Sequence, residues 1–155
     1  MSLLNHLINY MSEIDKDNTV TVSEVGPGPF VQSVTVRGHK LFADEPLSFP
    51  EGTDKGLSPN DFLLSSLGSC TSITLRMYAR LKKLPLDKII ITLNKNDNGD
   101  IDRKIELIGN LTDEQRNRLF EISNKCPIHK ALTNTVKINS KLILKILILI
   151  NKNFF

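Results

Sequence analysis

Two cysteines are the side chains of this sequence whose type and setting could support chemistry. Cys70 lies in the run SSLGSCTS and Cys126 in the run NKCPIH. Two thiols whose Cα atoms lie within about 7 Å can interconvert between a dithiol and a disulfide. A thiolate at a helix N-terminus or beside a cation has a lowered pKa and is a strong nucleophile. A cysteine can also fill space as a small buried hydrophobe, and the residues alone leave both readings open.

Cys70 is predicted to lie on one long helix over residues 57–84. Ser58 is a suitable N-cap, Pro59 fits the first helical position, and Asp61 suits the positive end of the helix dipole. Apolar or small residues recur at steps of three and four, and the predicted buried stripe is Leu63, Leu67, Cys70, Thr74, Met77 and Leu81. Because the residues around Cys70 are small, we expect a second helix to pack closely at the level of this thiol.

Cys126 is predicted to lie where one helix ends and the next begins. Thr112 and Gln115 have the spacing of a capping box, which indicates a helix start. Pro127 cannot continue that helix but is well suited to open another, so Cys126 should lie near the N-cap of the second helix. On these local grounds Cys126 is the more easily ionised thiol.

Cations and histidines near the cysteines are further candidates. Arg37 follows a predicted strand and precedes Gly38, and its guanidinium could hold a Cys70 thiolate. His129 follows Cys126 by three positions, but a single CxxH without a second pair of ligands is a weak zinc signal, so we expect neither a metal nor another cofactor. Tyr78 is expected on the outer side of the long helix.

The remaining segments predict a mixed α+β domain. Alternating residues bounded by turn signals indicate strands over 19–25, 30–44 (two strands joined around Gly38), 86–96, 101–111 and 135–139. A short amphipathic helix is predicted over 3–14, and residues 45–56 are predicted to form a loop. We expect a single domain over residues 1–140, followed by an atypical apolar and basic tail over residues 141–155.

Composition and charge narrow the function classes. The chain has 155 residues, of which 40% are hydrophobic and 24% charged, as in an ordinary globular domain. Its net charge of +3 arises from three lysines of the tail, so no concentrated basic patch points to nucleic acid. No apolar run is long enough to span a bilayer, and the start lacks the features of a signal peptide. We expect a cytoplasmic protein, in which cysteines are typically reduced and redox-active or catalytic.

Three motifs resemble the OsmC/Ohr family, and most closely its shorter OsmC-like branch. They are HKLFADEP, GLSPNDFLLSSLGSCTSITLRMYA and LTDEQRNRLFEISNKCPIHKAL, and the resemblance runs from about residue 18 to 139. It implies an OsmC-like α+β fold in which two chains intertwine as a homodimer, with long central helices flanked by antiparallel sheets. It also implies thiol peroxidase activity toward organic hydroperoxides, with regeneration by an external dithiol such as a lipoyl group.

The resemblance assigns roles to particular residues. Cys70 matches the family's peroxidatic cysteine, Cys126 matches the resolving cysteine, and Arg37 approximates the strand arginine that supports the thiolate. Where characterised peroxidases carry a Glu, this chain has Asn60, and Asp61 is expected to cap the helix rather than to act on the thiol. Two alternatives stay open, a dimer that binds an apolar small molecule without turnover and a dimer that senses redox state.

Overall fold

The computed structural model describes residues 19–142 of the chain, and it is a mixed α+β structure. The predicted helix over 3–14 and all but the first two residues of the tail lie outside the described residues. In chain order the elements are β1 (Thr21–Glu24), β2 (Gln32–Val36), β3 (His39–Ala43), α2 (Pro59–Leu81), β4 (Lys88–Lys95), β5 (Ile101–Ile108), α3 (Asp113–Ser123) and α4 (Pro127–Thr133). The predicted fold class is confirmed.

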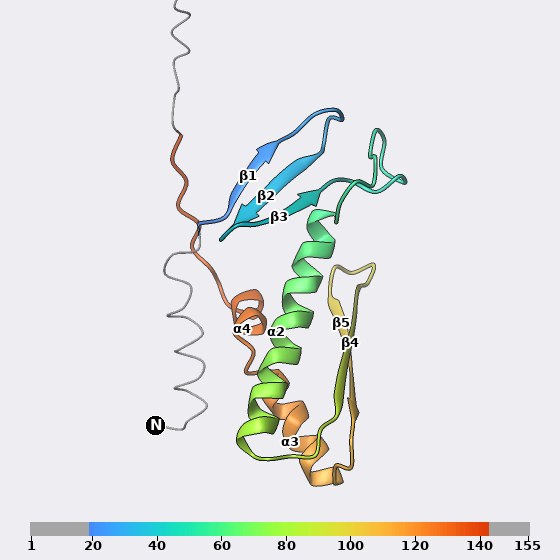
Figure 1. Ribbon diagram of the computed structural model, residues 1–155, viewed down its shortest axis with the longest axis vertical. Coiled ribbons are helices and arrows are strands. Elements are labelled where there is room, and N and C mark those ends of the chain that lie inside the picture. The colour runs from blue at the N-terminus through green and yellow to red at the C-terminus, as the bar shows by residue number, and fades with distance from the viewer. Residues whose placement is uncertain (1–18, 143–155) are drawn as a thin grey trace, which may run out of the picture.

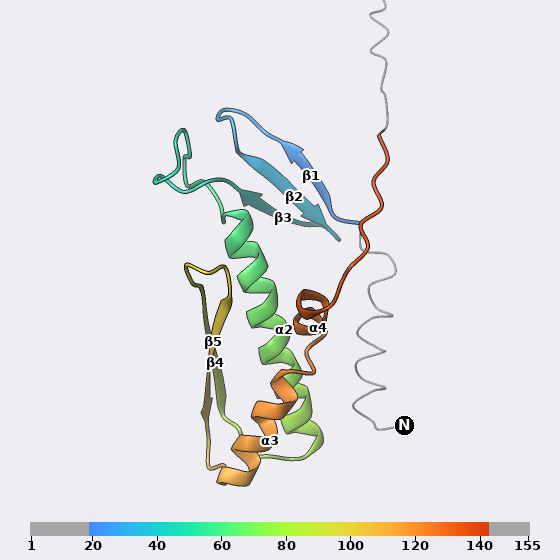
Figure 2. The same ribbon diagram turned by 180° about the vertical axis from the view of Figure 1, so that it is seen from behind.

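The long helix α2 is the centre of the arrangement. Both views show the antiparallel β4–β5 hairpin along one side of α2 and the short helix α4 on the opposite side (Figures 1 and 2). The antiparallel sheet β1-β2-β3 lies beyond the N-terminal end of α2, and α3 packs near its C-terminal end (Figure 1). Because α4 and the hairpin lie on opposite sides of α2, the helix has two separate faces, one toward α4 and one toward the hairpin.

The start of α2 follows the sequence prediction. The Ser58 hydroxyl accepts a hydrogen bond from the Asp61 amide at 3.2 Å, and the Asp61 carboxylate accepts one from the Ser58 amide at 3.0 Å. Hydrogen bonds from the side chain and then the backbone of Ser58 hold the pKa of Asp61 below its ordinary value. Asp61 therefore caps the helix, as expected, and its carboxylate is committed to this role.

The core lies beside the C-terminal half of α2. Its buried members are Leu75, Tyr78, Ala79, Leu86, Leu111, Leu119 and Ile122, with apolar residues of β4 and β5 packed against them. The buried stripe of α2 is rotated slightly from the predicted one, since it passes through Thr71 and Leu75 and leaves Cys70 half-buried at its edge. The expectation that Tyr78 faces outward is wrong, because only 8% of Tyr78 is exposed.

The small residues around Cys70 are packed against two different neighbours, the α3–α4 junction and the β4–β5 hairpin. The α3–α4 junction lies against α2 at the level of Cys70, as expected for a second helix. Gly68, however, faces the hairpin, where a Cβ atom would lie 2.8 Å from Cδ1 of Leu93. Glycine at this position therefore permits the close approach of α2 and β4.

Two segments on either side of these elements complete the fold. The predicted strand over residues 135–139 is wrong, because this segment pairs with no strand in the described part of the chain and has no regular structure.

The loop from β3 to α2 is ordered by Asp44, whose carboxylate accepts hydrogen bonds from the amides of Glu45, Thr53 and Lys55 and from the Thr53 hydroxyl. These hydrogen bonds lower the pKa of Asp44, and the bond from the Thr53 hydroxyl has the largest effect.

A candidate thiol site between α2 and α4

The two cysteines lie together between α2 and α4. Cys70 is near the middle of α2, and Cys126 is the N-cap residue of α4. Both are free thiols, and each shifts the pKa of the other, so the two side chains are close neighbours. Cys126 is completely buried, with 0% of its surface exposed, whereas Cys70 is half-buried. The pair thus joins one accessible sulfur to one inaccessible sulfur.

The helix α3 delivers Cys126 to this position. Thr112 and Gln115 form the predicted capping box at its start, with hydrogen bonds of 3.2 and 3.0 Å. Leu119 and Ile122 anchor the helix in the core, where both are fully buried. The chain then leaves α3 and turns at Pro127, so that Cys126 lies against α2.

The two thiols have pKa values displaced in opposite directions. The hydrogen bond from the Cys70 thiol is the main cause that lowers the pKa of Cys126, to about 6, and the amides of His129 and Ile128 act in the same direction. The hydrogen bond with Cys126, together with burial, raises the pKa of Cys70. The two thiols therefore titrate as one coupled pair, which shares one proton and carries one negative charge at neutral pH.

Two threonines of α2 contact the sulfurs. The hydroxyl of Thr71, which is fully buried, is hydrogen-bonded to Cys126 and lowers its pKa. The buried hydroxyl of Thr74 lowers the pKa of Cys70, and it has no hydrogen-bond partner among the described residues.

Arg103 is a charged residue of the site that the sequence prediction missed. It lies on β5, and its guanidinium interacts electrostatically with Cys126. Burial lowers the pKa of Arg103, and the charge of Cys126 opposes that shift. The alternation of β5 could have revealed Arg103, because residues 101, 103 and 105 lie on the same face of the strand. Arg103 is thus the charged residue between Ile101 and Ile105 on the inward face.

Arg37 is the residue that the sequence analysis predicted to support the Cys70 thiolate. It lies in the turn between β2 and β3 with a positive φ of 48°. The groups that shift the pKa values of Cys70 and Cys126 do not include it. Its predicted support of the Cys70 thiolate stays a prediction.

A titration of the thiols tests the electrostatic arrangement. Because the pKa of Cys126 is lowered to about 6, one thiolate per chain should appear as the pH rises through that value. The ultraviolet absorbance of thiolate measures this step without requiring a reagent to reach a buried sulfur. Cys126→Ser breaks the coupled pair and should therefore remove the low-pH step. A step near pH 6 that persists in Cys126→Ser would contradict the assignment.

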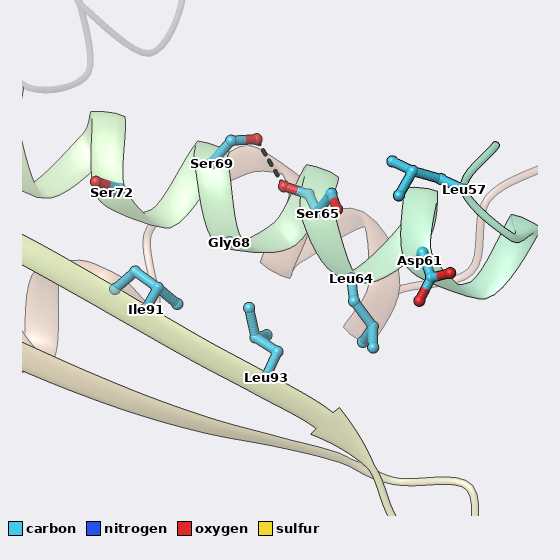
Figure 3. Close-up of a pocket in the computed structure, with 9 residues that line it drawn as sticks. All are labelled: Leu57, Asp61, Leu64, Ser65, Gly68, Ser69, Ser72, Ile91 and Leu93. Atoms are coloured by element: carbon cyan, nitrogen blue, oxygen red, sulfur yellow. Dashed lines mark hydrogen bonds between the residues drawn. The ribbon is translucent and has the colours of Figure 1, made fainter. Parts of the chain in front are cut away.

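A separate groove lies on the other side of α2. It has a volume of about 570 Å³ between α2 and β4 and is lined by small residues of the helix, with Ile91 and Leu93 of the strand pointing toward them (Figure 3). Cys70 does not belong to its lining. The groove is open and has both polar and apolar lining residues, and neither cysteine is among them.

The fold and the paired cysteines together define a class of protein: an α+β domain in which a dithiol is held between a long central helix and a short helix. The family model described as OsmC-like protein matches residues 52–141, which include both cysteines. The chain belongs to this OsmC-like family. A sequence comparison with curated proteins finds no match.

Solved structures of low sequence identity share the fold. An OsmC-like protein from Mycoplasma pneumoniae is 21% identical, with a TM-score of 0.62 and coverage of 77% of this chain and 89% of that one. A second structure, described as a putative osmotic stress induced and detoxification response protein from Psychrobacter arcticus, is 20% identical. It has a TM-score of 0.61, with coverage of 74% of this chain and 86% of that one. No helix of residues 19–142 has the length and hydropathy needed to cross a membrane.

Proposed function

We propose that this protein is a thiol peroxidase that reduces organic hydroperoxides through Cys70 and Cys126. The observation that carries the proposal is the contact between the two thiols, one half-buried and one fully buried. A peroxide can reach only the more exposed sulfur, so accessibility assigns the first step to Cys70. Cys126 is already in contact and suits the second step. The sequence resemblance to the OsmC/Ohr family supports the same division of roles.

The proposed cycle has two chemical steps. Proton transfer along the hydrogen bond from Cys70 to Cys126 places the negative charge on the Cys70 sulfur, which attacks the distal peroxide oxygen. The O–O bond breaks, the alkoxide takes the proton from Cys126 and leaves as an alcohol, and Cys70 becomes a sulfenic acid while Cys126 becomes a thiolate. The Cys126 thiolate then attacks this sulfur, releases hydroxide and forms the disulfide. An external dithiol reduces the disulfide by two electrons and is itself oxidised.

The proposed working form is a homodimer in the cytoplasm. The groove beside Gly68 and the exposed apolar face of the first sheet, which includes Val22 and Leu41, are unpaired in the described chain. A second copy that covered both surfaces would remove their exposed apolar side chains from water. Arg37 is proposed to support the Cys70 thiolate in this dimer, and that role rests on the sequence resemblance.

One equivalent of an organic hydroperoxide tests the proposed function. We expect the reduced protein to lose both thiols and to form a Cys70–Cys126 disulfide, which mass spectrometry identifies after digestion. Repeated additions with a dithiol reductant should then give sustained consumption of peroxide. A disulfide without sustained turnover would instead identify a redox-sensing dimer. Retention of both thiols would identify a protein without peroxide chemistry.

A further inference from the structure

Arg103 connects α2 to the segment that precedes Cys126. Its guanidinium donates to the Thr71 hydroxyl on α2 at 3.1 Å. It also donates to the Ser123 carbonyl at 3.4 Å, to the Ser123 hydroxyl at 3.2 Å and to the Asn124 side-chain oxygen at 2.8 Å. Thr71 directly follows Cys70, and Ser123 and Asn124 lie just ahead of Cys126. One side chain of β5 therefore holds both cysteine segments in place.

The charge of Arg103 has no carboxylate partner in residues 19–142. All four of its hydrogen-bond acceptors are neutral. Among the described residues, the arginine that forms a salt bridge with a carboxylate is Arg118, whose partner is Glu121. The charged group with which Arg103 interacts is Cys126. A half-buried guanidinium is stabilised by a nearby anion, and here that anion is a thiolate.

The interaction exists in only one redox state of the pair. The reduced pair carries one negative charge when Cys126 is ionised, whereas the disulfide carries none. Reduction of the disulfide at such a pH takes up two electrons from an external dithiol and one proton from solvent, and it yields one thiol and one thiolate. The cation beside the pair is thus compensated after reduction and uncompensated after oxidation.

We propose that Arg103 is a positioning residue that holds the Cys126 turn against α2, supplies the counter-charge of the reduced pair and thereby favours the dithiol over the disulfide. This inference rests on the proposed function only in that Cys70 and Cys126 form a disulfide. It requires no particular peroxide. Arg103 touches no substrate, so it acts through the sulfurs.

The equilibrium with dithiothreitol at fixed ratios of its oxidised and reduced forms tests the inference. Arg103→Met keeps much of the side-chain volume and removes the charge. If the loss of charge raises the pKa of the pair by one unit, the equilibrium constant for reduction falls about tenfold above that pKa. The difference from the wild type should vanish at acidic pH, where both reduced pairs are neutral. Arg103→Lys, which keeps the charge, should recover most of the equilibrium constant.

A matched control separates charge from structure. Arg116 is also half-buried, and it donates to the carbonyls of Leu107 at 2.6 Å and Gly109 at 3.1 Å, away from the cysteines. Arg116→Met should leave the equilibrium and its pH dependence unchanged. Should Arg103→Met fail to fold by circular dichroism, Arg103→Gln replaces it, because glutamine retains a donor for Ser123 and is neutral.

The outcomes distinguish the two proposals. A wild-type protein that forms no Cys70–Cys126 disulfide at any buffer ratio contradicts the proposed function itself. A wild type that forms the disulfide, with neutral Arg103 variants that match it at every pH, overturns the role of Arg103 alone. A shift of the same size at all pH values also overturns it, because a purely structural effect does not depend on the ionisation of a thiol.

Discussion

Cys70→Ser is expected to reduce hydroperoxide consumption to the rate measured without protein. A serine hydroxyl does not ionise near neutral pH, so the substituted residue cannot attack the peroxide oxygen. Cys126 cannot take over the reaction, because it is fully buried beneath the Cys70 segment. The measurement is the loss of an organic hydroperoxide over time in the presence of excess dithiol.

Cys126→Ser is the matched variant for this experiment, since it makes the same substitution at the other sulfur. It should consume about one equivalent of peroxide per chain and then stall, with Cys70 trapped as a sulfenic acid. A probe that reacts with sulfenic acid detects this product by mass spectrometry. Full consumption by Cys70→Ser, or immediate inactivity of both variants with the fold intact, would contradict the assigned order of attack.

Leu75→Ala is expected to lower the free energy of unfolding by about 2–5 kcal/mol. Leu75 is fully buried, with 0% of its surface exposed, and it lies where α2 meets α3 and the hairpin. Removing three carbons there leaves a cavity that the surrounding helices can close only in part. Because α3 positions Cys126, we also expect a less defined thiol pair in the folded fraction. Urea unfolding followed by circular dichroism measures the change.

Leu47→Ala is the control, because it makes the same chemical change where 75% of the side chain is exposed. It should change the free energy of unfolding by no more than about 0.5 kcal/mol. Equal losses in the two variants would show that the core is not centred on α2. Comparing protein concentrations in the same unfolding series separates dimer dissociation from unfolding of the single chain.

Local sequence signals predicted most of the elements. Ser58, Asp61, Thr112 and Gln115 form the expected capping boxes, since a cap depends only on residues three positions apart. The hairpin of β4 and β5 followed from alternation around a turn, and its register is regular over eight residue pairs. The strand predicted over 135–139 failed because alternation alone supplies no partner, and none is present in the described part of the chain.

The candidate site was less accessible to sequence reasoning. Proline at position 127 correctly placed Cys126 at a helix start, but nothing local places that start beside Cys70. Arg103 was missed because its importance depends on which segments β5 faces, and this is settled by tertiary packing. Arg37 was chosen for its neighbours in sequence, it lies in the turn between β2 and β3, and its role stays a prediction.

The backbone amide of Ile128 lowers the pKa of both cysteines, and this affects the transfer of charge between the two sulfurs. The same N–H stabilises negative charge on Cys126 and on Cys70. A charge that moves from one sulfur to the other keeps this donor, so little reorganisation of the backbone is needed. In the proposed cycle, negative charge can therefore pass from the buried sulfur to the more exposed one without losing this backbone donor.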